Sequence, residues 1–488
     1  MIRIDVSFKT LLLNYNYNIL KMKKPLLLLF ISFNIFCYSQ WNNGNIAFNQ
    51  IRANIEFVDS NSFLVAGGQS WSNGGTNINI VQLAHLYNIS AHQSSILAMN
   101  TPRLEPIMVR GDSGVYIIGG ISNWADVNGN GWLYENTMEI YKDGNFTQVS
   151  IPFSTADGHA VALNGKIIVA GGLKYWKWYQ AAADVVGETQ FWIYDEATMV
   201  WSSIPSTDNR FYSSAVTDGN IAIFAGGLTM SDNPSSILDG YSLSNAYEIY
   251  DSQTDSWTTG NLGPNSARAK ISACYCNGYF VFAGGSVGNN VGSPRVDIYD
   301  GTTWTNQNMA NGTRAVEACA TAGNKILFAG GLQHDLTWHY GGSNITNRID
   351  VFDTQTQSFS YDNLTRPLMD FRMAGYGRRA AASPGVSFPG GNYTGYNDVQ
   401  IYEDASWINS INENLSDISL YPNPTKENIT ISLQNFNGSI QSEVYDLIGN
   451  RLKSTNETTI SLRDFAKGIY IIKVTYGDRV EEVKVIKE

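Results

Sequence analysis

Charged residues are scarce in this chain, and basic residues are scarcer than acidic ones. Only 15% of the 488 residues are charged, and 32 lysines and arginines stand against 43 aspartates and glutamates, which gives a formal net charge of −11. A surface that binds nucleic acid or an anionic membrane needs a basic excess. The composition therefore argues against both kinds of partner, while 43% hydrophobic residues supply ample material for a globular core.

Cysteine is scarce as well, with four residues in the chain. Three of them, Cys274, Cys276 and Cys319, lie beyond the N-terminal segment described next. An odd number of cysteines in so long a chain argues against a disulfide framework, although exported chains can form disulfides. Cys274 and Cys319 occupy matching places in two neighbouring repeats where other repeats carry Ala or Ser, so we expect them to be small buried apolar residues.

The apolar run at residues 26–36 is too short for a membrane-spanning helix. It follows Met22 and two lysines and precedes small residues, an arrangement typical of a signal peptide. We expect cleavage between Ser39 and Gln40 and no transmembrane segment in the mature chain. Residues 1–39 are thus interpreted as an N-terminal extension and signal peptide, with translation starting at either of the first two methionines.

Glycine and tyrosine are abundant, with 45 and 27 residues, and the glycines are not scattered. A short run of β-forming residues ends in Gly-Gly six times, as in KIIVAGG and KILFAGG, and a degenerate seventh pair stands at 390. Each pair is followed by a loop and then by an alternating strand that ends in an aromatic residue, often with an acid and a later Trp or Phe. Such alternation predicts antiparallel strands and an all-β chain. The six regular pairs begin at 67, 119, 171, 226, 284 and 330.

This repeat resembles the kelch repeat, in which an apolar strand, Gly-Gly, Tyr-Asp and Trp recur. The resemblance covers residues 41–407 and implies a β-propeller with one four-stranded blade per repeat, seven blades or alternatively six. We expect the glycines to permit a tight turn near the crowded channel. Trp41 lies 26 residues before Gly67, in phase with later outer-strand tryptophans. The first strand is therefore expected to pair into the last blade and close the ring, in competition with Trp407.

The pattern changes after a polar linker at 408–417. Residues 418–488 read as short alternating strands with turns at YPNP, LIGN and YGD, which predicts a small antiparallel β-sandwich. LYPNP, VYDLIGNRL and GIYIIKV resemble the C-terminal sorting domain of the type IX secretion system of Bacteroidetes. The resemblance implies contact with that secretion machinery and removal of the tail. It also implies a chain secreted to the medium or attached to the outer-membrane surface of a Gram-negative bacterium. The alternative is a generic adhesive β-sandwich.

The loops after Gly-Gly are long, unlike each other and rich in aromatic residues. In a propeller these loops share one face with the connections that enter each first strand, and unrepeated loop residues are where binding can reside. Aromatic rings on polar loops can stack on sugars or anchor a protein; alternatively they pack the loops together. The ligand-binding candidates from these loops are Trp124, Trp176, Trp178, Trp338, His339 and Tyr393.

Arginine recurs at one position of the repeat, 16 residues before Gly-Gly, and we call this the arginine position. Arg52 lies 15 residues before its pair, and the third repeat has Thr155 instead. The fork of an arginine suits a carboxylate or sulfate, and in some kelch proteins such arginines grip an acidic ligand. The alternative is a structural ring that bonds loop carbonyls. The four candidates are Arg103, Arg210, Arg268 and Arg314.

The segment DVNGNGWLYE at 126–135 matches the first half of a calcium-binding loop. Asp126, Asn128 and Asn130 place oxygen atoms on alternate residues, and Glu135 could reach inward. The alternative is an Asn-Gly turn. This calcium is the one metal the sequence suggests, and no other cofactor is expected.

Two functions stay open. The favoured one is an exported propeller that binds a glycan or a protein. The alternative is a carbohydrate-acid isomerase similar to the sialic-acid mutarotases, using Arg210, Arg268, His334 and Glu188 on the same face. No nucleophile–base constellation is readable, and no histidine falls in the spacing of copper ligands that a galactose-oxidase-like enzyme would need.

Overall fold

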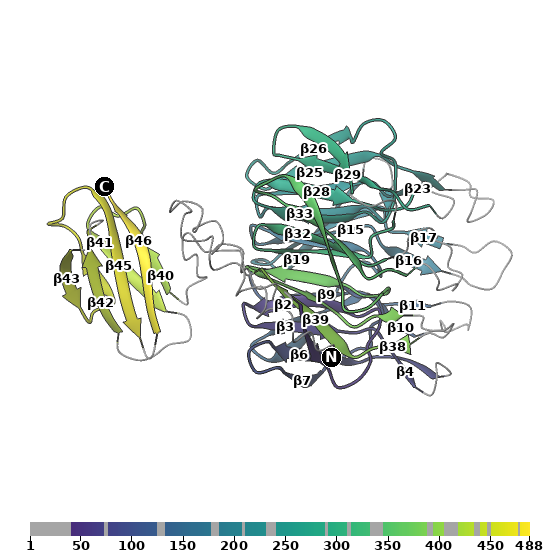
Figure 1. Ribbon diagram of the computed structural model, residues 1–488, viewed down its shortest axis with the longest axis horizontal. Coiled ribbons are helices and arrows are strands. Elements are labelled where there is room, and N and C mark those ends of the chain that lie inside the picture. The colour runs from purple at the N-terminus through teal and green to yellow at the C-terminus, as the bar shows by residue number, and fades with distance from the viewer. Residues whose placement is uncertain are drawn as a thin grey trace, which may run out of the picture. The chain divides into compact units, whose positions relative to one another are not determined.

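Every regular element that the structure describes is a β-strand (Figure 1). The computed structural model describes residues 41–72, 77–123, 132–176, 185–206, 210–230, 241–287, 291–309, 314–331, 345–387, 394–404, 418–433, 440–446, 450–476 and 479–488. The chain divides into two compact units, Met1–Ala405 and Ser406–Glu488. None of the described residues belongs to a helix that is long and apolar enough to cross a membrane.

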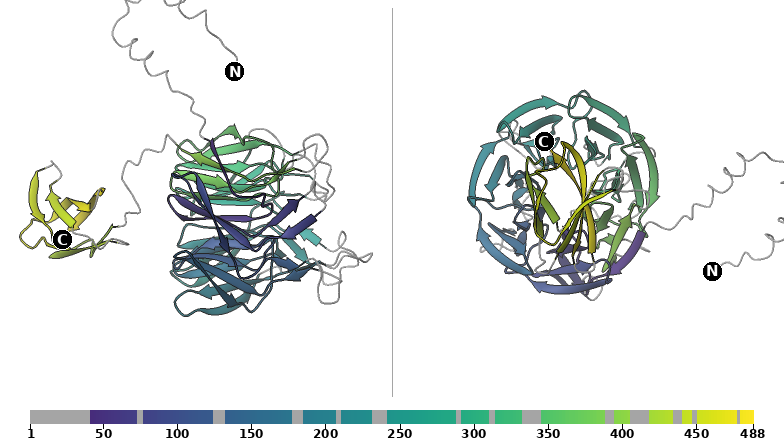
Figure 2. Two further views of the ribbon diagram at one scale, coloured as in Figure 1. Left: turned by 90° about the horizontal axis from the view of Figure 1, so that it is seen from below. Right: turned by 90° about the vertical axis from the view of Figure 1, so that its left-hand side faces the viewer.

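The first unit is a β-propeller whose described residues form seven four-stranded antiparallel sheets, or blades, arranged as a ring (Figure 2). The first strand of each blade contacts the first strand of the next, and β35 of the last blade contacts β2 of the first. The strands of blades one to three are β2 (Asn54–Asp59), β3 (Ser62–Ala66), β6 (Leu83–Asn88), β7 (Gln93–Ala98); β8 (Ile107–Arg110), β9 (Val115–Ile118), β12 (Thr137–Lys142), β13 (Asn145–Ser150); and β14 (His159–Leu163), β15 (Lys166–Ala170), β18 (Gln190–Asp195), β19 (Val200–Pro205).

The remaining four blades repeat the same order from the axis outward. Their strands are β21 (Ser214–Thr217), β22 (Ile221–Ala225), β25 (Ala246–Asp251), β26 (Ser256–Asn261); β27 (Ser272–Cys276), β28 (Tyr279–Ala283), β29 (Arg295–Tyr299), β30 (Trp304–Asn308); β31 (Ala318–Ala322), β32 (Lys325–Ala329), β33 (Arg348–Asp353), β34 (Ser358–Asn363); and β35 (Met373–Tyr376), β36 (Arg379–Ala382), β39 (Asp398–Glu403), β1 (Trp41–Asn45).

Burial along each blade follows from its place in the ring. The second strands are apolar and almost completely buried, because both faces of a blade pack against neighbouring blades. The fourth strands of most blades are largely exposed, with one half-buried side chain every third residue or so. Hydrophobic layers therefore lie between consecutive blades rather than in one central core.

Gly-Gly recurs because it joins consecutive blades. Both glycines of each regular pair have positive φ, for example 61° at Gly119 and 96° at Gly120. A Cβ atom on Gly119 would collide with the carbonyl oxygen of Thr155 in the next blade. The N–H of Gly120 donates to that same carbonyl at 2.7 Å. The tight turn expected from the sequence is therefore present, and the crowding comes from the backbone of the next blade.

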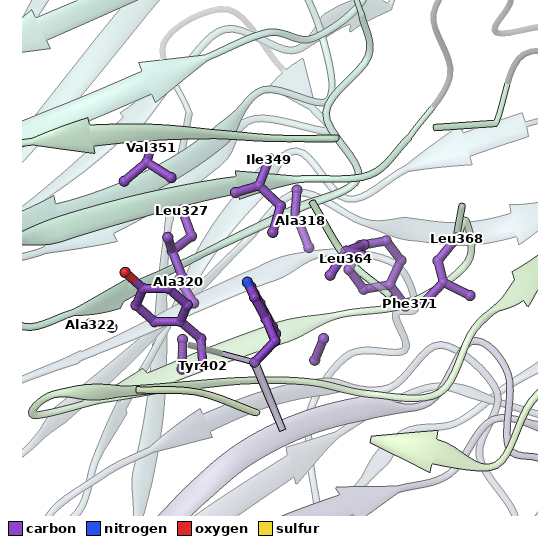
Figure 3. Packing of buried hydrophobic residues seen from close by; sticks show 14 residues of the cluster. Ala318, Ala320, Ala322, Leu327, Ile349, Val351, Leu364, Leu368, Phe371 and Tyr402 are labelled. Carbon is purple, nitrogen blue, oxygen red and sulfur yellow. The ribbon is translucent and has the colours of Figure 1, made fainter. Parts of the chain in front are cut away.

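The ring is closed by the N-terminal strand, as expected. β1 pairs antiparallel with β39, and Trp41 stands opposite Tyr402. The Trp41 ring lies 5.3 Å from the Tyr402 ring, and its Nε1 donates to Asp362 Oδ2 of blade six at 2.9 Å. Side chains of blades six and seven, including Leu327 and Ile349, pack around this junction (Figure 3). Trp407 lies outside the described residues.

Two expectations need correction. The seventh repeat does not use Gly390 at the end of its second strand; Val386 takes the bridging place of Gln69, so Pro384 and Gly385 stand in the place of the glycine pair. Cys274 and Cys319 are not merely small buried residues, because their sulfur atoms form a disulfide between the first strands of blades five and six. Matching register on neighbouring first strands is what brings the two residues together.

In blades one to four and in blade seven, the loops between second and third strands form small sheets of their own at one edge of the ring, which we call the loop face (Figure 1). The connections that lead into each first strand lie on the same face, because strands alternate in direction. The added strands are β4 (Gln69–Ser72), β5 (Asn77–Ile80), β10 (Ile121–Asn123), β11 (Leu133–Tyr134), β16 (Leu173–Trp176), β17 (Val185–Gly187), β20 (Arg210–Phe211), β23 (Leu228–Met230), β24 (Tyr241–Leu243), β37 (Val386–Ser387) and β38 (Thr394–Gly395).

The second unit consists of two antiparallel sheets around one apolar core, which is the β-sandwich expected from the sequence. Ile429, Val444 and Ile472 are completely buried in it. One sheet contains β40 (Ile418–Tyr421), β41 (Asn428–Leu433) and β44 (Thr459–Ser461); the other contains β43 (Arg451–Thr455), β42 (Ile440–Tyr445), β45 (Gly468–Tyr476) and β46 (Arg479–Lys487).

Candidate functional site: a charged cluster on the propeller axis

The four candidate arginines are buried, with 0–2% of each residue exposed. Arg103, Arg210 and Arg314 each donate through Nη1 to the carbonyl of the first glycine of their own pair, at 2.6–3.0 Å. Arg268 reaches the equivalent carbonyl of Gly284 through Nε at 2.8 Å. The guanidinium groups thus satisfy backbone carbonyls that the glycine turn leaves without strand partners, which favours the structural alternative for these residues.

Each of these arginines also pairs with a buried carboxylate on the third strand of its blade. Arg268 and Asp297 are 2.7 Å apart, as are Arg314 and Asp350. Arg103 pairs with Glu139 at 3.4 Å, and Arg210 pairs with Glu248. Burial lowers the pKa of Arg314 to about 10, with Asp350 acting against that shift. All four pairs are internal to the fold, with both partners buried.

Arg52 is not a member of this arginine set. Ile51 bridges to Gln69 as Leu104 bridges to Ile121, so Gln50 occupies the arginine position in blade one and Arg52 lies two residues beyond it. Gln50 is buried, donates to the carbonyls of Gly67 and Leu83, and contacts His85 Nδ1 at 2.8 Å. A one-residue difference in loop length hides this shift in the sequence.

The position two residues beyond the arginine position, which we call the axial position, has positive φ in six blades, with values of 51–56°. These residues are Arg52, Glu105, Asp157, Tyr212, Lys270 and Asp370. Their backbones meet: Glu105 N donates to Arg52 O at 3.3 Å, and Asp157 N donates to Glu105 O at 3.1 Å. Arg52 N in turn donates to Asp370 O at 3.0 Å, which connects blades seven, one, two and three.

Side chains from distant blades meet here. Asp157 of blade three pairs with Lys270 of blade five at 3.3 Å and with Arg372 of blade seven at 3.1 Å. Blade three adjoins only blades two and four, so these contacts must cross the centre of the ring. Arg372 also binds Glu317 at 3.2 Å. We define the axial cluster as Arg52, Glu105, Asp157, Lys270, Glu317, Asp370 and Arg372.

The axial cluster is enclosed by protein yet reached by solvent. Its side chains are 14–43% exposed, with Lys270 and Arg372 the most open. Arg52 links the remaining acids, at 3.5 Å from Glu105 and 3.3 Å from Asp370. Three cations and four carboxylates share this space: Arg52 and Arg372 each contact two carboxylates, and Asp157 contacts both Lys270 and Arg372.

The carboxylates of the axial cluster differ in the direction of their pKa shifts. Burial alone would raise the pKa of Asp157, but Lys270, Arg372 and His159 outweigh it and hold that pKa below its usual value. Burial raises the pKa of Glu317 to about 7 in spite of Arg372. It also raises the pKa of Glu105, against the pull of Arg52. The cluster thus contains one acid whose pKa is lowered beside two whose pKa values are raised.

Aromatic side chains and a histidine surround the acids. Lys270 Nζ lies 4.5 Å from the centre of the Tyr212 ring. Burial, then Asp157 and Glu105, raise the pKa of Tyr212 well above its ordinary value. Burial and the same two acids raise the pKa of Tyr134, whose hydroxyl has no hydrogen-bond partner among the described residues. Burial lowers the pKa of His159 to about 4, so this histidine is neutral at neutral pH.

The other predicted site residues do not reach this cluster in the described part of the chain. Trp176 ends β16, where its backbone pairs with Val185. Trp124, Trp178, Trp338, His339, Tyr393 and the calcium candidates Asp126, Asn128 and Asn130 lie outside the described residues. Glu135, the fourth calcium candidate, accepts from Thr137 Oγ1 at 3.3 Å. No group of three or more metal-ligating side chains occurs among the described residues.

Sequence reasoning missed the axial cluster, although a signal exists. The axial position lies 14 residues before the glycine pair in five repeats, and three of these carry Glu105, Asp157 and Lys270 there, at the entrance to an apolar strand. Charges at a repeated position that should face the ring centre predict an axial cluster. The shifted first repeat and the missing glycine pair of the seventh conceal two of its members, Arg52 and Asp370.

Comparisons with known proteins separate the two units. A fungal alcohol oxidase of the AA5 family in complex with copper is similar in structure, with a TM-score of 0.53 and 15% identity over 91% of this chain and 99% of that one. The structure of YjhT has a TM-score of 0.48 and 14% identity, covering 65% of this chain and 99% of the other. At such identities the likeness concerns the fold alone. No curated protein matches the chain.

The second unit matches a known protein family. Residues 419–488 match the family described as the secretion system C-terminal sorting domain. This range begins within β40 and covers both sheets of the sandwich. The likeness to LYPNP and GIYIIKV noted in the sequence is therefore confirmed. Residues 419–488 are a type IX secretion sorting domain, and they direct this propeller chain to the cell surface or the medium.

Proposed function

We propose that the exported propeller is a binding module whose loop face takes a glycan or protein ligand carrying an acidic group. The observation that carries the proposal is Arg372, which is 31% exposed at the ring centre and shared between Asp157 and Glu317. A carboxylate or sulfate can take one of its two bidentate edges without leaving a buried acid unpaired, because Lys270 still holds Asp157.

The position of the cluster supports this assignment. Repeated residues of the propeller are packed, whereas the axial residues differ from blade to blade and keep partial exposure on the face where the unlike loops lie. The sorting domain brings this face into contact with extracellular molecules. Binding requires no cofactor, and the cations come from the chain itself.

A glycan array that includes uronic-acid, sialylated and sulfated glycans, together with a pull-down from extracellular material, tests the proposal. Arg372→Met should lower the affinity for the ligand found by at least tenfold. Arg366→Met is the matched control, because Arg366 is 29% exposed on the same blade and pairs with Asp398 outside the cluster. Equal affinity of both variants and the wild type would contradict the proposal.

A second function is favoured by one observation, the raised pKa of Glu317 to about 7 beside Arg372. An acid that exchanges its proton near neutral pH, next to a cation that can hold a carboxylate, suits proton transfer on a sugar acid, as in a carbohydrate-acid isomerase. The earlier candidates are placed less well: Arg210 and Arg268 are buried, Glu188 pairs with Lys174, and His334 lies outside the described residues. Proton NMR of anomer exchange, with Glu317→Gln as the inactive variant, tests this alternative.

A further inference from the structure

Blade three departs from blades two, four, five and six at two linked positions. Blades two, four, five and six bury an arginine and a third-strand carboxylate, as in Arg268 and Asp297. Blade three has Thr155 at the arginine position and Trp192 at the carboxylate position, two residues before the tyrosine that ends the strand pattern. Because the arginine and the carboxylate are both replaced, neither charge is left buried without its partner. Blade three therefore also lacks the long arginine side chain that the four other blades have at this position.

An open pocket of about 370 Å³ lies at this place. Its wall includes Phe153 and Ser154, which directly precede Thr155, and also Lys174, Glu188 and Trp192. Phe153 and Lys174 belong to the connection and the loop sheet on the loop face. The volume is in the range of small-ligand sites, which begin at roughly 300 Å³. The pocket therefore lies beside the changed pair, with Trp192 in its wall and Thr155 outside its lining.

The lining combines an aromatic surface with one ion pair. Phe153 and Trp192 are stacked, with centroids 4.7 Å apart and 13° between the rings. Trp192 is only half-buried, and its Nε1 is enclosed without a hydrogen-bond partner among the described residues. Lys174 Nζ lies 2.9 Å from Glu188 Oε2, and Glu188 is almost completely buried while Lys174 is 39% exposed.

We propose that this blade-three pocket is a second binding site, for a neutral sugar residue. Lys174 and Glu188 cancel each other's charge, so the pocket holds no excess charge for an ionic ligand. An anion that took Lys174 away would leave the buried Glu188 carboxylate unpaired, which is costly. A sugar hydroxyl can accept from the ammonium and donate to the carboxylate while the pair stays intact. The apolar C–H face of a sugar ring suits the half-buried indole.

The blade-three pocket does not depend on the axial cluster, because the two sites share no residue. Their proposed ligands also differ: a neutral sugar in the pocket and an acidic group at the cluster. The two proposals can therefore fail separately. Variants at Arg372 should leave the neutral-sugar site unchanged, and variants in the blade-three pocket should leave binding of the acidic ligand unchanged.

The experiment uses the full chain, isothermal titration calorimetry and saturation-transfer NMR with three neutral probes: methyl β-glucoside, methyl β-galactoside and methyl α-mannoside. Methyl β-glucuronide is the charged counterpart. We expect saturable binding of at least one neutral probe and weaker binding of the glucuronide. Lys174→Met should weaken binding at least tenfold, whereas Lys166→Met should not; Lys166 is a similarly exposed lysine of the same blade, paired with Asp255.

The decisive variant restores the pattern of the other blades. Thr155→Arg combined with Trp192→Glu should rebuild the buried pair, fill the pocket and abolish neutral-sugar binding while the melting temperature is maintained. If this double variant does not fold, Ser154→Phe fills the pocket from its wall and should have the same effect on binding. Absence of saturable binding by all three neutral probes, a preference for the glucuronide, or undiminished binding in the filled pocket would each overturn the proposal.

Discussion

Arg372 of blade seven and Asp157 of blade three form an ion pair across the propeller axis, with 3.1 Å between Nη2 and Oδ1 and a sequence separation of 215. Neighbouring blades are held by glycine turns and apolar layers. This pair instead joins blades that have no common surface, and it does so where solvent still reaches both side chains. The centre of the ring is therefore a polar junction whose ionisation affects stability as well as binding.

The first prediction concerns pH. The pKa of Glu317 is about 7 in the folded protein, above its usual 4.5, because the carboxyl is buried. The folded state thus binds the proton more tightly than the unfolded state does. The stabilisation is fully present below pH 4.5 and is lost as pH rises to 7.

Glu317→Gln should remove this dependence. Relative to the variant, the wild type should lose up to about 3 kcal/mol of unfolding free energy between pH 4.5 and pH 7.5. Urea denaturation of both proteins across this range measures the difference. Burial also raises the pKa of Glu56 to about 7, so part of the dependence should persist in the variant. Parallel pH profiles for wild type and Glu317→Gln would refute the prediction.

The second prediction concerns the buried arginines. Arg103→Met would leave Glu139, which is completely buried, with the backbone N–H groups of Asn100 and Thr101 as its donors. The variant should lose about 3–5 kcal/mol of unfolding free energy, because a buried carboxylate loses its cation. Adding Glu139→Leu should recover part of the loss.

Affinity distinguishes this structural role from ligand binding. Ligand affinity of the folded Arg103→Met protein should equal that of the wild type. The Arg103→Met protein could instead melt like the wild type and bind its ligand at least tenfold more weakly. This result would assign a ligand-binding role to Arg103 and, by extension, to Arg210, Arg268 and Arg314.

The third prediction concerns the glycine turns. Gly119 has φ of 61°, and a Cβ atom there would collide with the Thr155 carbonyl oxygen. Gly219 has φ of 95°, and a Cβ atom there would meet nothing within 4 Å. Gly219→Ala should cost about 1–2 kcal/mol from backbone conformation alone. Gly119→Ala should cost clearly more, because a backbone group of the next blade must also move. Equal melting temperatures of the two variants would count against the blade-joining role.

The fourth prediction concerns the cysteines. The Cys274–Cys319 disulfide closes a loop with a sequence separation of 45 residues between blades five and six. Its reduction should lower the unfolding free energy by about 2–4 kcal/mol. Burial raises the pKa of the remaining thiol, Cys276, to about 11, so this thiol should resist alkylation until the protein unfolds. Mass spectrometry after alkylation in denaturant without reductant should find one modified cysteine in the mature chain; three would disprove the disulfide.

The fifth prediction concerns processing. The sorting domain at 419–488 is expected to be removed after export, so the extracellular protein should run from Gln40 to a cut between residues 408 and 418. Intact-mass measurement of the protein from medium and cell surface checks both ends. An extracellular form that keeps the tail would show that residues 419–488 are retained after transport.

The sequence by itself determined the architecture, because the architecture is repeated. Recurrence of an apolar strand, Gly-Gly and an aromatic strand end predicted an all-β repeat chain, and its resemblance to the kelch repeat implied the propeller. The phase of Trp41 was enough to predict that the first strand completes the last blade. The short alternating strands after residue 418 likewise predicted the sandwich, and its resemblance to a known sorting domain implied the sorting role. Such features depend on contacts between neighbouring strands, and local spacing encodes them.

Only the tertiary structure decided where the charges lie. The regularly spaced arginines were predicted to contact a ligand, but they are buried and donate to glycine carbonyls. Arg372 and Asp157, which no spacing connects, meet on the axis. The joint change to Thr155 and Trp192 in blade three is recognised only when the arginine and its third-strand carboxylate are seen as one pair. The physical reason is that closing the ring brings side chains from seven separate repeats together at the axis, and no local spacing in the sequence connects those side chains.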